Sequence, residues 1–441
     1  MDSILQILEA IKAAEIKAHK IIKDTLDLKY KSSLDLDDKD KVSNVLFYMD
    51  NLCAIENLIS NGYSNSFDLI YLDPPFFTNS IFNKNISITT SHYDLKLKVP
   101  VYSDNWQNSL FEYLEMITTR LILMRDLLSD QGTIYVHIDW RVVHYVRLIL
   151  DYVFGKERFL NEIIWSYKSG GAGRRSFSKK HDNILVYTKS KSYIFNVSKE
   201  KSYNREFKPY RFKNVLEYED EKGWYTLVNS KDVWNIDMVG RTSSERVDYA
   251  TQKPYKLLEK IILTSSNKDS LIGDFFVGSG TSLLVAEKLQ RRWVGSDNSI
   301  HSIIQVKKRL RDRNGAYNYF YKKNGDSMKT LRNIKCIKNN NYLEVDLKDI
   351  SLDLENEMQD YFKGKDINEI DYFKDNAFLF LDYISISSSL NRDFLISDFF
   401  RPEIASRLII PYSSENLENI FIKSVDVWGN EYTNNLDMSF I

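Results

Sequence analysis

The sequence predicts an α/β fold with a Rossmann-like sheet that carries helices on both faces. Residues 45–72 and 271–297 support this prediction, because each stretch reads as a strand, a helix and a second strand. The first stretch ends at Asp73, directly before two prolines, and the second contains a glycine turn after its first strand. Open α/β sheets bind their ligands at the carboxyl ends of the strands. We therefore expect both sequences to line a ligand site.

The length and composition indicate more than one domain. A chain of 441 residues is longer than an ordinary domain, and its 43% of hydrophobic residues is enough for a core. We expect residues 1–42 to form a helix and a linker, and residues 166–250 to be an insertion between the two α/β halves at 43–165 and 251–325. Residues 326–441, which contain short β-like runs, are expected to form a small β-rich extension.

Three local expectations concern segments outside the strand–helix units. Apolar residues recur with helical period in residues 3–24, which predicts a helix that packs on the main domain, with a dimerisation helix as the alternative. The polar residues 31–41 read as a linker. Residues 78–106 read as a long polar loop, and loops of that length are usually functional.

Charge is unevenly distributed along a chain with 60 Lys and Arg and 61 Asp and Glu. Residues 165–214 hold 13 basic and 3 acidic residues, whereas residues 330–441 hold 11 and 20. Tyrosine and phenylalanine are interleaved with the basic residues, and such surfaces offer cations to phosphates and rings to bases. The basic segment therefore predicts a nucleic-acid surface, with a solvated basic face as the alternative. The candidate phosphate contacts follow a glycine-rich run and are Arg174, Arg175, Lys179 and Lys180.

Two cysteines are too few for a disulfide framework or a cysteine metal cluster, so no metal site is expected. We find no signal peptide and no apolar run long enough to cross a membrane. A cytoplasmic protein without a membrane partner is the expectation.

The Asp73-Pro74-Pro75-Phe76 sequence predicts a binding site for an amino group on a flat ring. Prolines cannot donate ladder hydrogen bonds, so the strand has to end before Pro74. The Asp73 carboxylate and the Pro74 carbonyl offer two acceptors for the two N–H bonds, and Phe76 offers a face for stacking. A strand-ending turn with a surface aspartate is the alternative for this motif alone.

The second glycine sequence, Gly278-Ser279-Gly280, predicts a tight turn at a helix N-terminus that a ligand can approach closely. Asp297 follows Gly278 by 19 residues at the end of the next strand, where a carboxylate can accept hydrogen bonds from ribose hydroxyls. Leu283 stands where the dinucleotide motif has its third glycine, which argues against a nicotinamide cofactor.

The two motifs, in this order, resemble the β-class amino-group DNA methyltransferases, which include the Mod subunits of type III restriction systems. The similarity covers about residues 43–325, and further matching stretches are Met49-Asp-Asn-Leu52, Gly132-Thr-Ile-Tyr-Val-His-Ile-Asp139 and Thr251-Gln-Lys-Pro254. In that class a target-recognition region separates the two motifs, which implies this role for residues 166–250. The sequence departs from the class at Met49, where a glycine is usual, and at Phe77, where an asparagine is common.

The resemblance implies S-adenosylmethionine as the methyl donor and double-stranded DNA with a flipped-out base as the substrate. It places the target amine at Asp73, Pro74, Pro75 and Phe76. The base would stack on Phe76 or Phe77, with Phe76 preferred and with Trp165 and Tyr167 as second candidates. The cofactor residues that it implies are Asp50 and Asn51 at the adenine ring, Lys253 closing the pocket, Asp274, Phe276, Gly278 and Gly280 around the methionine end, and Asp297 at the ribose.

Aspartate before the two prolines favours adenine N6 over cytosine N4 as the methylated atom. A cytosine-N4 enzyme and a catalytically inactive DNA-binding module of the same fold are the alternatives, and an RNA methyltransferase is disfavoured by the large basic insertion. The sequence shows no helicase motif and no nuclease carboxylate cluster, so a restriction subunit would be a separate polypeptide. A homodimer is left open.

Overall fold

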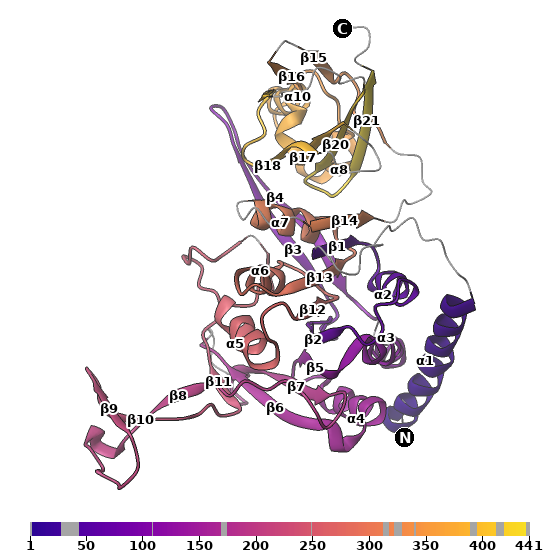
Figure 1. Ribbon diagram of the computed structural model, residues 1–441. Helices are drawn as coiled ribbons and strands as arrows, with labels where there is room; N and C mark the ends of the chain where they lie inside the picture. Colours follow the sequence, from indigo (N-terminus) through magenta and orange to yellow (C-terminus); the bar gives the residue numbers. More distant parts are fainter. Residues whose placement is uncertain are drawn as a thin grey trace. The chain divides into compact units, whose positions relative to one another are not determined.

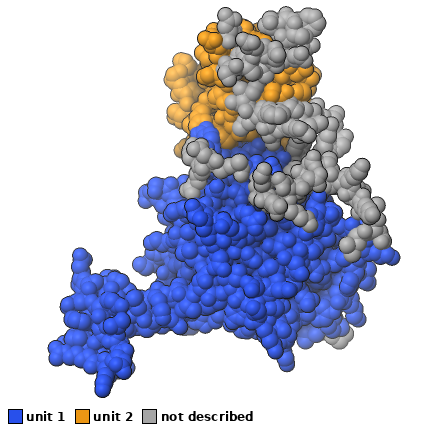
Figure 2. Space-filling model, in the orientation of Figure 1, with its two compact units in different colours: residues 1–80, 103–321 blue, residues 81–102, 322–441 orange. Residues whose placement is uncertain are grey.

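The computed structural model describes residues 2–27, 44–107, 109–168, 174–247, 249–311, 317–321, 329–338, 341–388, 395–411 and 419–437. The chain forms two compact units (Figure 2). Unit 1 consists of residues 1–80 and 103–321, and unit 2 consists of residues 81–102 and 322–441. Each unit is therefore assembled from two separate stretches of the chain.

The described part of unit 1 is built on a nine-stranded sheet. Its strands pair in parallel, except that β7 runs antiparallel to both of its neighbours. In spatial order they are β11 (Val233–Asn235), β6 (Phe159–Ser166), β7 (His181–Thr188), β5 (Leu128–Ile138), β2 (Phe67–Leu72), β12 (Leu271–Asp274), β13 (Arg292–Asp297), β1 (Asn44–Tyr48) and β14 (Tyr317–Tyr321).

Helices cover both faces of this sheet (Figure 1). Along β2, Ile70 and Leu72 enter one hydrophobic core while Leu69 and Tyr71 enter another, because successive strand residues point to opposite faces. The predicted Rossmann-like fold is confirmed. The first core also contains side chains of α1 (Asp2–Asp27), α2 (Asn51–Ser60), α3 (Leu110–Leu127) and α4 (Val143–Phe154), and the second those of α5 (Tyr255–Ser265), α6 (Thr281–Lys288) and α7 (Ile300–Leu310).

The N-terminal helix α1 packs on the main domain, as predicted. Its buried side chains, which include Ile7, Ala10 and Ile11, belong to the same core as α3. Polar contacts at its edge join Lys17 to Glu115, and the Tyr152 hydroxyl donates to Glu15. The linker expected at residues 31–41 lies outside the described residues. None of the described helices is long and apolar enough to span a membrane.

The prediction of a polar loop at residues 78–106 is wrong. This stretch contains β3 (Ser80–Thr89) and β4 (Asp94–Asp104), which pair as a two-stranded ribbon. Ile86, Ile88, Leu95 and Val99 of the ribbon are buried in the hydrophobic core of unit 2. The partners of these side chains lie more than 200 residues away in the sequence, so local pattern alone could not reveal their burial.

Residues 166–250 are more regular than the sequence indicates. Strands β7 and β11 belong to the central sheet, so this stretch is not a segment separate from the two α/β halves. Residues 199–229 form a three-stranded sheet with the order β8-β10-β9, which we call the arm (Figure 1). The arm consists of β8 (Lys199–Tyr203), β9 (Glu217–Asp220) and β10 (Gly223–Asn229), with a 3₁₀ turn at Arg205–Phe207 after β8. Outside the arm, a second 3₁₀ turn at Lys156–Arg158 precedes β6.

Unit 2 contains the β-rich extension that the sequence predicts. Lys84 of the ribbon forms an ion pair with the buried carboxylate of Asp382, with Nζ 3.0 Å from Oδ2. One described sheet of this unit has the strand order β15 (Lys335–Lys338), β16 (Tyr342–Asp346) and β19 (Arg407–Pro411). Another has the order β18 (Leu395–Phe400), β17 (Leu381–Ser387), β20 (Asn419–Asp426) and β21 (Glu431–Asp437). The described helices are α8 (Leu354–Glu357), α9 (Gln359–Phe362), α10 (Ile367–Asp375) and the 3₁₀ turn Ala377–Phe380.

Candidate active site

The carboxyl ends of four neighbouring parallel strands carry the predicted acidic residues. Strands β2, β12, β13 and β1 lie side by side, so Asp73, Asp274, Asp297 and Asp50 follow one another along one edge of the sheet. A pocket that is partly open to solvent contains both motifs: Asp73 and Lys253 line it together with Gly278. The fold thus brings the two predicted sequences into one site across 205 residues of chain.

The two carboxylate oxygens of Asp73 have different surroundings. Its Oδ2 lies 2.5 Å from the Lys253 ammonium, and both side chains are mostly buried. Its Oδ1 is buried and has no hydrogen-bond partner among the described residues, and His137 Nδ1 lies 4.0 Å from it. A buried acceptor without a donor costs free energy, on the order of 1–3 kcal/mol. Asp73 therefore presents one oxygen to which none of the described residues donates.

Contacts with Tyr113 and Asp104, which also belong to unit 1, hold the loop that follows Asp73. The Tyr113 hydroxyl donates to the Pro75 carbonyl at 2.9 Å, and the Tyr113 ring packs on Phe77. The Thr78 amide and hydroxyl both donate to Asp104 Oδ2 at 2.7 Å. These contacts hold the backbone of the motif in place.

Phe76, rather than Phe77, faces the titratable groups of the site. Its ring centroid is 5.7 Å from that of His137, and the Lys253 ammonium lies 5.3 Å from the same centroid. Of the second stacking candidates, Trp165 is 1% exposed and donates from its indole to the Ile236 carbonyl, as a core residue does. Tyr167 is half-buried, and its hydroxyl donates to Asp182.

The glycine turn has the geometry that the sequence predicts. Gly278 and Gly280 have φ values of 52° and 79°, in the region that favours glycine. A Cβ atom on Gly280 would lie 2.8 Å from Val306, so no larger residue fits there without movement. Gly280 is the N-cap of α6, and the turn therefore presents backbone to the pocket at a helix N-terminus.

Asp274 and Asp297 lie beside this turn, and the pKa of each carboxyl group is raised. Asp274 is buried and accepts hydrogen bonds from the Ser282 hydroxyl and the Phe276 amide. Burial raises the pKa of Asp274 to about 7, with a further contribution from the Asp73 carboxylate. Burial also raises the pKa of Asp297, whose Oδ2 accepts from the Gly278 amide at 2.8 Å. A cationic ligand would relieve the cost of ionising these carboxylates, so the pocket fits a cofactor with a sulfonium centre.

Three predicted cofactor residues have protein partners that sequence analysis does not anticipate. Asn51 is buried, donates to the Phe275 carbonyl and accepts from the Arg120 guanidinium. Asp50 caps α2 through the Leu52 amide and also pairs with Arg120. Lys253, expected to close the cofactor pocket, lines the pocket of the glycine turn and also pairs with Asp73; its contact with a cofactor remains a prediction. Contacts between Asp50 or Asn51 and a cofactor adenine remain predictions.

A buried histidine lies beside Asp73, and sequence analysis assigns it no role. His137 is fully buried; Nδ1 lies 2.8 Å from the Tyr71 hydroxyl, and Nε2 lies 3.2 Å from Asp182 Oδ2. Burial tends to raise the pKa of Asp182, but the hydrogen bond to His137 and the nearby Lys253 charge bring it below its usual range. A histidine within the otherwise apolar strand sequence 134–138 was the available signal.

The predicted phosphate contacts are on the surface. Arg174, Arg175 and Lys179 are exposed, and the Lys179 ammonium lies 4.4 Å from the ring centroid of Trp140. The glycines at 170, 171 and 173 lie outside the described residues. Within the described residues, the lining of the Asp73 pocket includes none of these cations.

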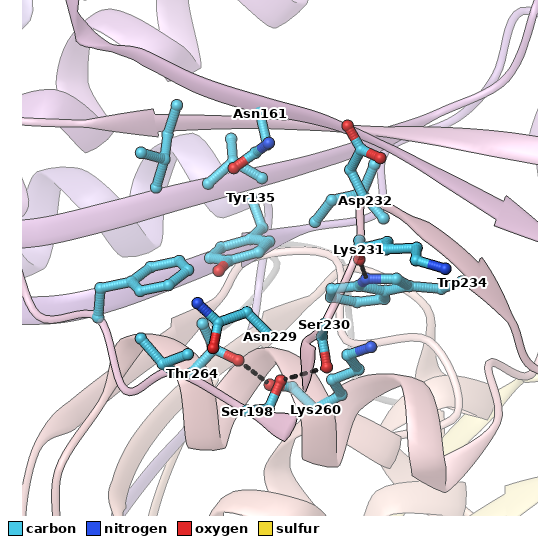
Figure 3. Close-up of a pocket in the computed structure, with 15 residues that line it drawn as sticks. Tyr135, Asn161, Ser198, Asn229, Ser230, Lys231, Asp232, Trp234, Lys260 and Thr264 are labelled. Carbon is cyan, nitrogen blue, oxygen red and sulfur yellow. Dashed lines mark hydrogen bonds between the residues drawn. The ribbon is translucent and has the colours of Figure 1, made fainter. Parts of the chain in front are cut away.

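A second, larger pocket lies at the root of the arm (Figure 3). It is partly open to solvent and lies between the sheet residue Tyr135, the arm residue Asn229, and Ser198 and Trp234, which flank the arm. Ser198 and Ser230 hydroxyls are joined by a hydrogen bond of 2.8 Å across the two strands that lead into the arm. None of the predicted site residues lines this pocket.

A Rossmann-like sheet with both motifs in one pocket defines a methyltransferase that uses S-adenosylmethionine. The family model described as DNA methylase (N6_N4_Mtase) matches residues 67–308. The chain belongs to this family of amino-group DNA methyltransferases.

The chain is also similar to curated type II methyltransferases and to solved structures. The chain is 28% identical over 348 residues to the type II methyltransferase M.EcaI of Enterobacter cloacae, covering 65% of this chain and 74% of M.EcaI. It is 30% identical over 253 residues to M.HpaI of Haemophilus parainfluenzae, covering 57% and 70%. The crystal structure of the M1.HpyAVI–SAM complex is similar over 60% of this chain and 98% of that one, with 18% identity and a TM-score of 0.40.

Proposed function

We propose that this DNA methyltransferase methylates N6 of a flipped-out adenine within a specific sequence of duplex DNA. The observation that carries the proposal is Asp73 Oδ1, which has no hydrogen-bond partner in the described part of the chain and lies in the same pocket as the glycine turn. An exocyclic amine has N–H groups that can supply the missing donor. The motif therefore has an unsatisfied acceptor where a target amine is needed.

The residues of the site have complementary parts in this reaction. S-adenosylmethionine, when bound, supplies a methyl group on a sulfonium centre. Asp73 Oδ1 and the Pro74 carbonyl accept hydrogen bonds from the two N–H groups of the amine and direct its lone pair toward that methyl group. Lys253 holds the Asp73 carboxylate in position through Oδ2. Orientation and electrostatic stabilisation are the main sources of rate in such a transfer.

A base inside a duplex cannot reach this pocket, so the proposal includes base flipping, at a cost of roughly a few kcal/mol. Phe76 is the ring that we assign to stacking on the flipped base, because Phe77 packs on Tyr113. The Lys253 ammonium and the His137 ring border the same ring.

Cytosine N4 is the second candidate for the methylated atom. Both targets are exocyclic amines of similar geometry, and aspartate before the two prolines favours adenine. An inactive DNA-binding module is disfavoured, because the acceptor at Asp73 and the turn at Gly278 and Gly280 are both intact.

Sequence choice is assigned to residues 166–250, within which the arm is the part that leaves the central sheet. The loop between β8 and β9 exposes Phe207 and Phe212 together with Arg205 and Lys208. Rings and cations on one exposed loop suit contacts with bases and phosphates.

The test is to express the chain in cells that lack other DNA methylation and to sequence their DNA with single-molecule reads. Modified adenine at one defined sequence is the expected result. Modified cytosine would establish the second candidate, and unmodified DNA would refute the catalytic proposal. Nucleoside mass spectrometry of the same DNA identifies the modified base independently.

A further inference from the structure

Methylation of an amine leaves one proton to be removed, and the buried groups beside Asp73 offer a path for it. When the nitrogen lone pair forms a bond to the methyl carbon, the carbon–sulfur bond breaks and its electron pair stays on sulfur. The nitrogen becomes positively charged as this bond forms, and one of its hydrogens leaves as a proton in the same step. The pocket has to pass that proton to solvent.

We propose that His137 and Asp182 form a proton relay that carries this proton away from Asp73. The inference rests on the proposed function, since it needs an amine held at Asp73 Oδ1. His137 acts on the reaction through Asp73 and is therefore a positioning residue, as is Asp182.

The two ring nitrogens of His137 lie near different carboxylates. Nδ1 faces Asp73 Oδ1 at 4.0 Å, and this is the oxygen for which the described residues supply no hydrogen-bond donor. Nε2 lies 3.2 Å from Asp182 Oδ2. A direct transfer from Asp73 requires the first distance to shorten by about 1 Å, as catalytic hydrogen bonds commonly do when substrate binds.

Tyr71 sets the starting tautomer of the histidine. Burial, with a further contribution from Asp73, raises the pKa of Tyr71 well above its usual range, so its hydroxyl keeps its proton. That hydroxyl lies 2.8 Å from Nδ1, and we assign it as the donor in this hydrogen bond, which places the ring proton on Nε2, directed at Asp182. When the Tyr71 hydroxyl turns away from Nδ1, the freed lone pair can take a proton from Asp73. The proton on Nε2 can then pass to Asp182, so one proton enters the ring as another leaves.

The charges around the ring favour the intermediate state. A doubly protonated His137 lies between the Asp73 and Asp182 carboxylates, and the carboxylates compensate its charge inside a buried site. The Lys253 ammonium faces Asp73 from the other side, at Oδ2, and Tyr167 donates to the second oxygen of Asp182. The ring is fully buried, whereas the Asp182 side chain is 14% exposed, so Asp182 is the exit to solvent.

The test compares single-turnover methyl transfer in H₂O and D₂O for the full chain with duplex DNA. His137→Gln keeps an N–H near Asp182 but removes Nδ1, and Asp182→Asn keeps the shape but removes the final acceptor. We expect each variant to lose about 10²-fold in rate, the usual scale of a proton-transfer contribution, with unchanged affinity for S-adenosylmethionine and DNA. Proton removal becomes limiting in these variants, so D₂O should slow them more than it slows the wild type.

His144→Gln, the same substitution at an exposed histidine on α4, is the matched control and should retain the wild-type rate. Small carboxylates such as formate should restore part of the rate of Asp182→Ala, because that side chain reaches the surface. A full rate in His137→Gln, or rate losses that are equal in H₂O and D₂O with no rescue, would overturn the relay. A wild-type protein that transfers no methyl group would instead refute the proposed function itself.

Discussion

The Lys253 ammonium lies 2.5 Å from Asp73 Oδ2, although 180 residues separate the two in the sequence. Their side chains are only 11% and 18% exposed. Lys253 precedes α5 and Asp73 follows β2, so the ion pair joins the two halves of the α/β domain at the pocket.

Replacing Lys253 should therefore affect stability as well as activity. Lys253→Met leaves the Asp73 carboxylate without its cation, and removing one partner of a buried pair typically costs about 3 kcal/mol. The loss should be smaller when Asp73→Asn is also present, because no unpaired charge is then left. Urea unfolding of the four proteins in this double-mutant cycle measures the coupling. Lys256→Met, one turn further along the chain at an exposed position, is the control, and equal losses at both lysines would contradict the prediction.

Asp73→Asn keeps the shape of the side chain but loses the charge that stabilises the amine as it becomes cationic. We expect the transfer rate to fall by about 10²-fold or more, equivalent to roughly 3 kcal/mol. Calorimetric titration with S-adenosylmethionine should show nearly unchanged binding, since the cofactor is assigned to the glycine turn. Tritium transfer from the labelled cofactor measures the rate. Lost cofactor binding would mean that Asp73 has a different role.

The pKa of Asp274 predicts a pH dependence of cofactor binding. Because this pKa is raised to about 7, the carboxylate is largely protonated at pH 6 and ionised at pH 8. A cationic cofactor prefers the ionised form, so its affinity should rise with pH up to about 7, by at most tenfold per unit, and then level off. Isothermal titration from pH 5.5 to 8.5 measures this slope, and Asp274→Asn should flatten it. An identical slope in the variant would assign the titration to another group.

The same raised pKa makes a prediction about the free protein. The folded state binds this proton more tightly than the unfolded chain, whose aspartate has a pKa near 3.8. The contribution of Asp274 to stability is therefore full below pH 3.8 and is lost as pH rises through 7. We therefore expect the stability difference between Asp274→Asn and the wild type to shift in favour of the variant when the pH is raised from 5 to 8. Thermal unfolding of both proteins at the two pH values measures this shift.

The exposed basic cluster is predicted to contact phosphates. Replacing Arg174, Arg175, Lys179 and Lys180 by alanine should flatten the plot of log affinity against log salt by about 0.9 for each lost phosphate contact. Fluorescence anisotropy with a labelled duplex measures this slope. Exposed lysines of unit 2, such as Lys335 and Lys365, provide the control substitutions. An unchanged slope in the quadruple variant would show that the cluster is a solvated surface.

The arm can be exchanged without disturbing the central sheet. Because β7 and β11 are sheet strands, a swap of all of residues 166–250 would remove part of the core, whereas a swap of residues 199–229 would not. We expect an arm from a relative to change the methylated sequence while the protein keeps its cofactor affinity. Single-molecule sequencing of the modified DNA measures the outcome, and an unaltered site would place sequence choice elsewhere.

Sequence pattern predicted the elements whose signals are local. The strands that end at Asp73 and Asp297 and the turn at Gly278 depend on residues next to them in the chain, and each lies where it was expected. The contacts that were missed, such as Lys253 with Asp73 and His137 with Asp182, join different elements and depend on strand order. The ribbon was missed for a similar reason, since Ile86 and Leu95 look exposed until their distant partners are known.

The ribbon has a practical consequence for shortened variants of this protein. A chain cut after residue 321 would keep Ile86, Ile88, Leu95 and Val99 but lose the core that covers them, so it should be prone to aggregation. Clean excision of unit 2 requires a second cut that replaces residues 81–102 by a short turn. The Thr78 amide lies 2.7 Å from the Asp104 carboxylate, so the two ends to be rejoined are already neighbours.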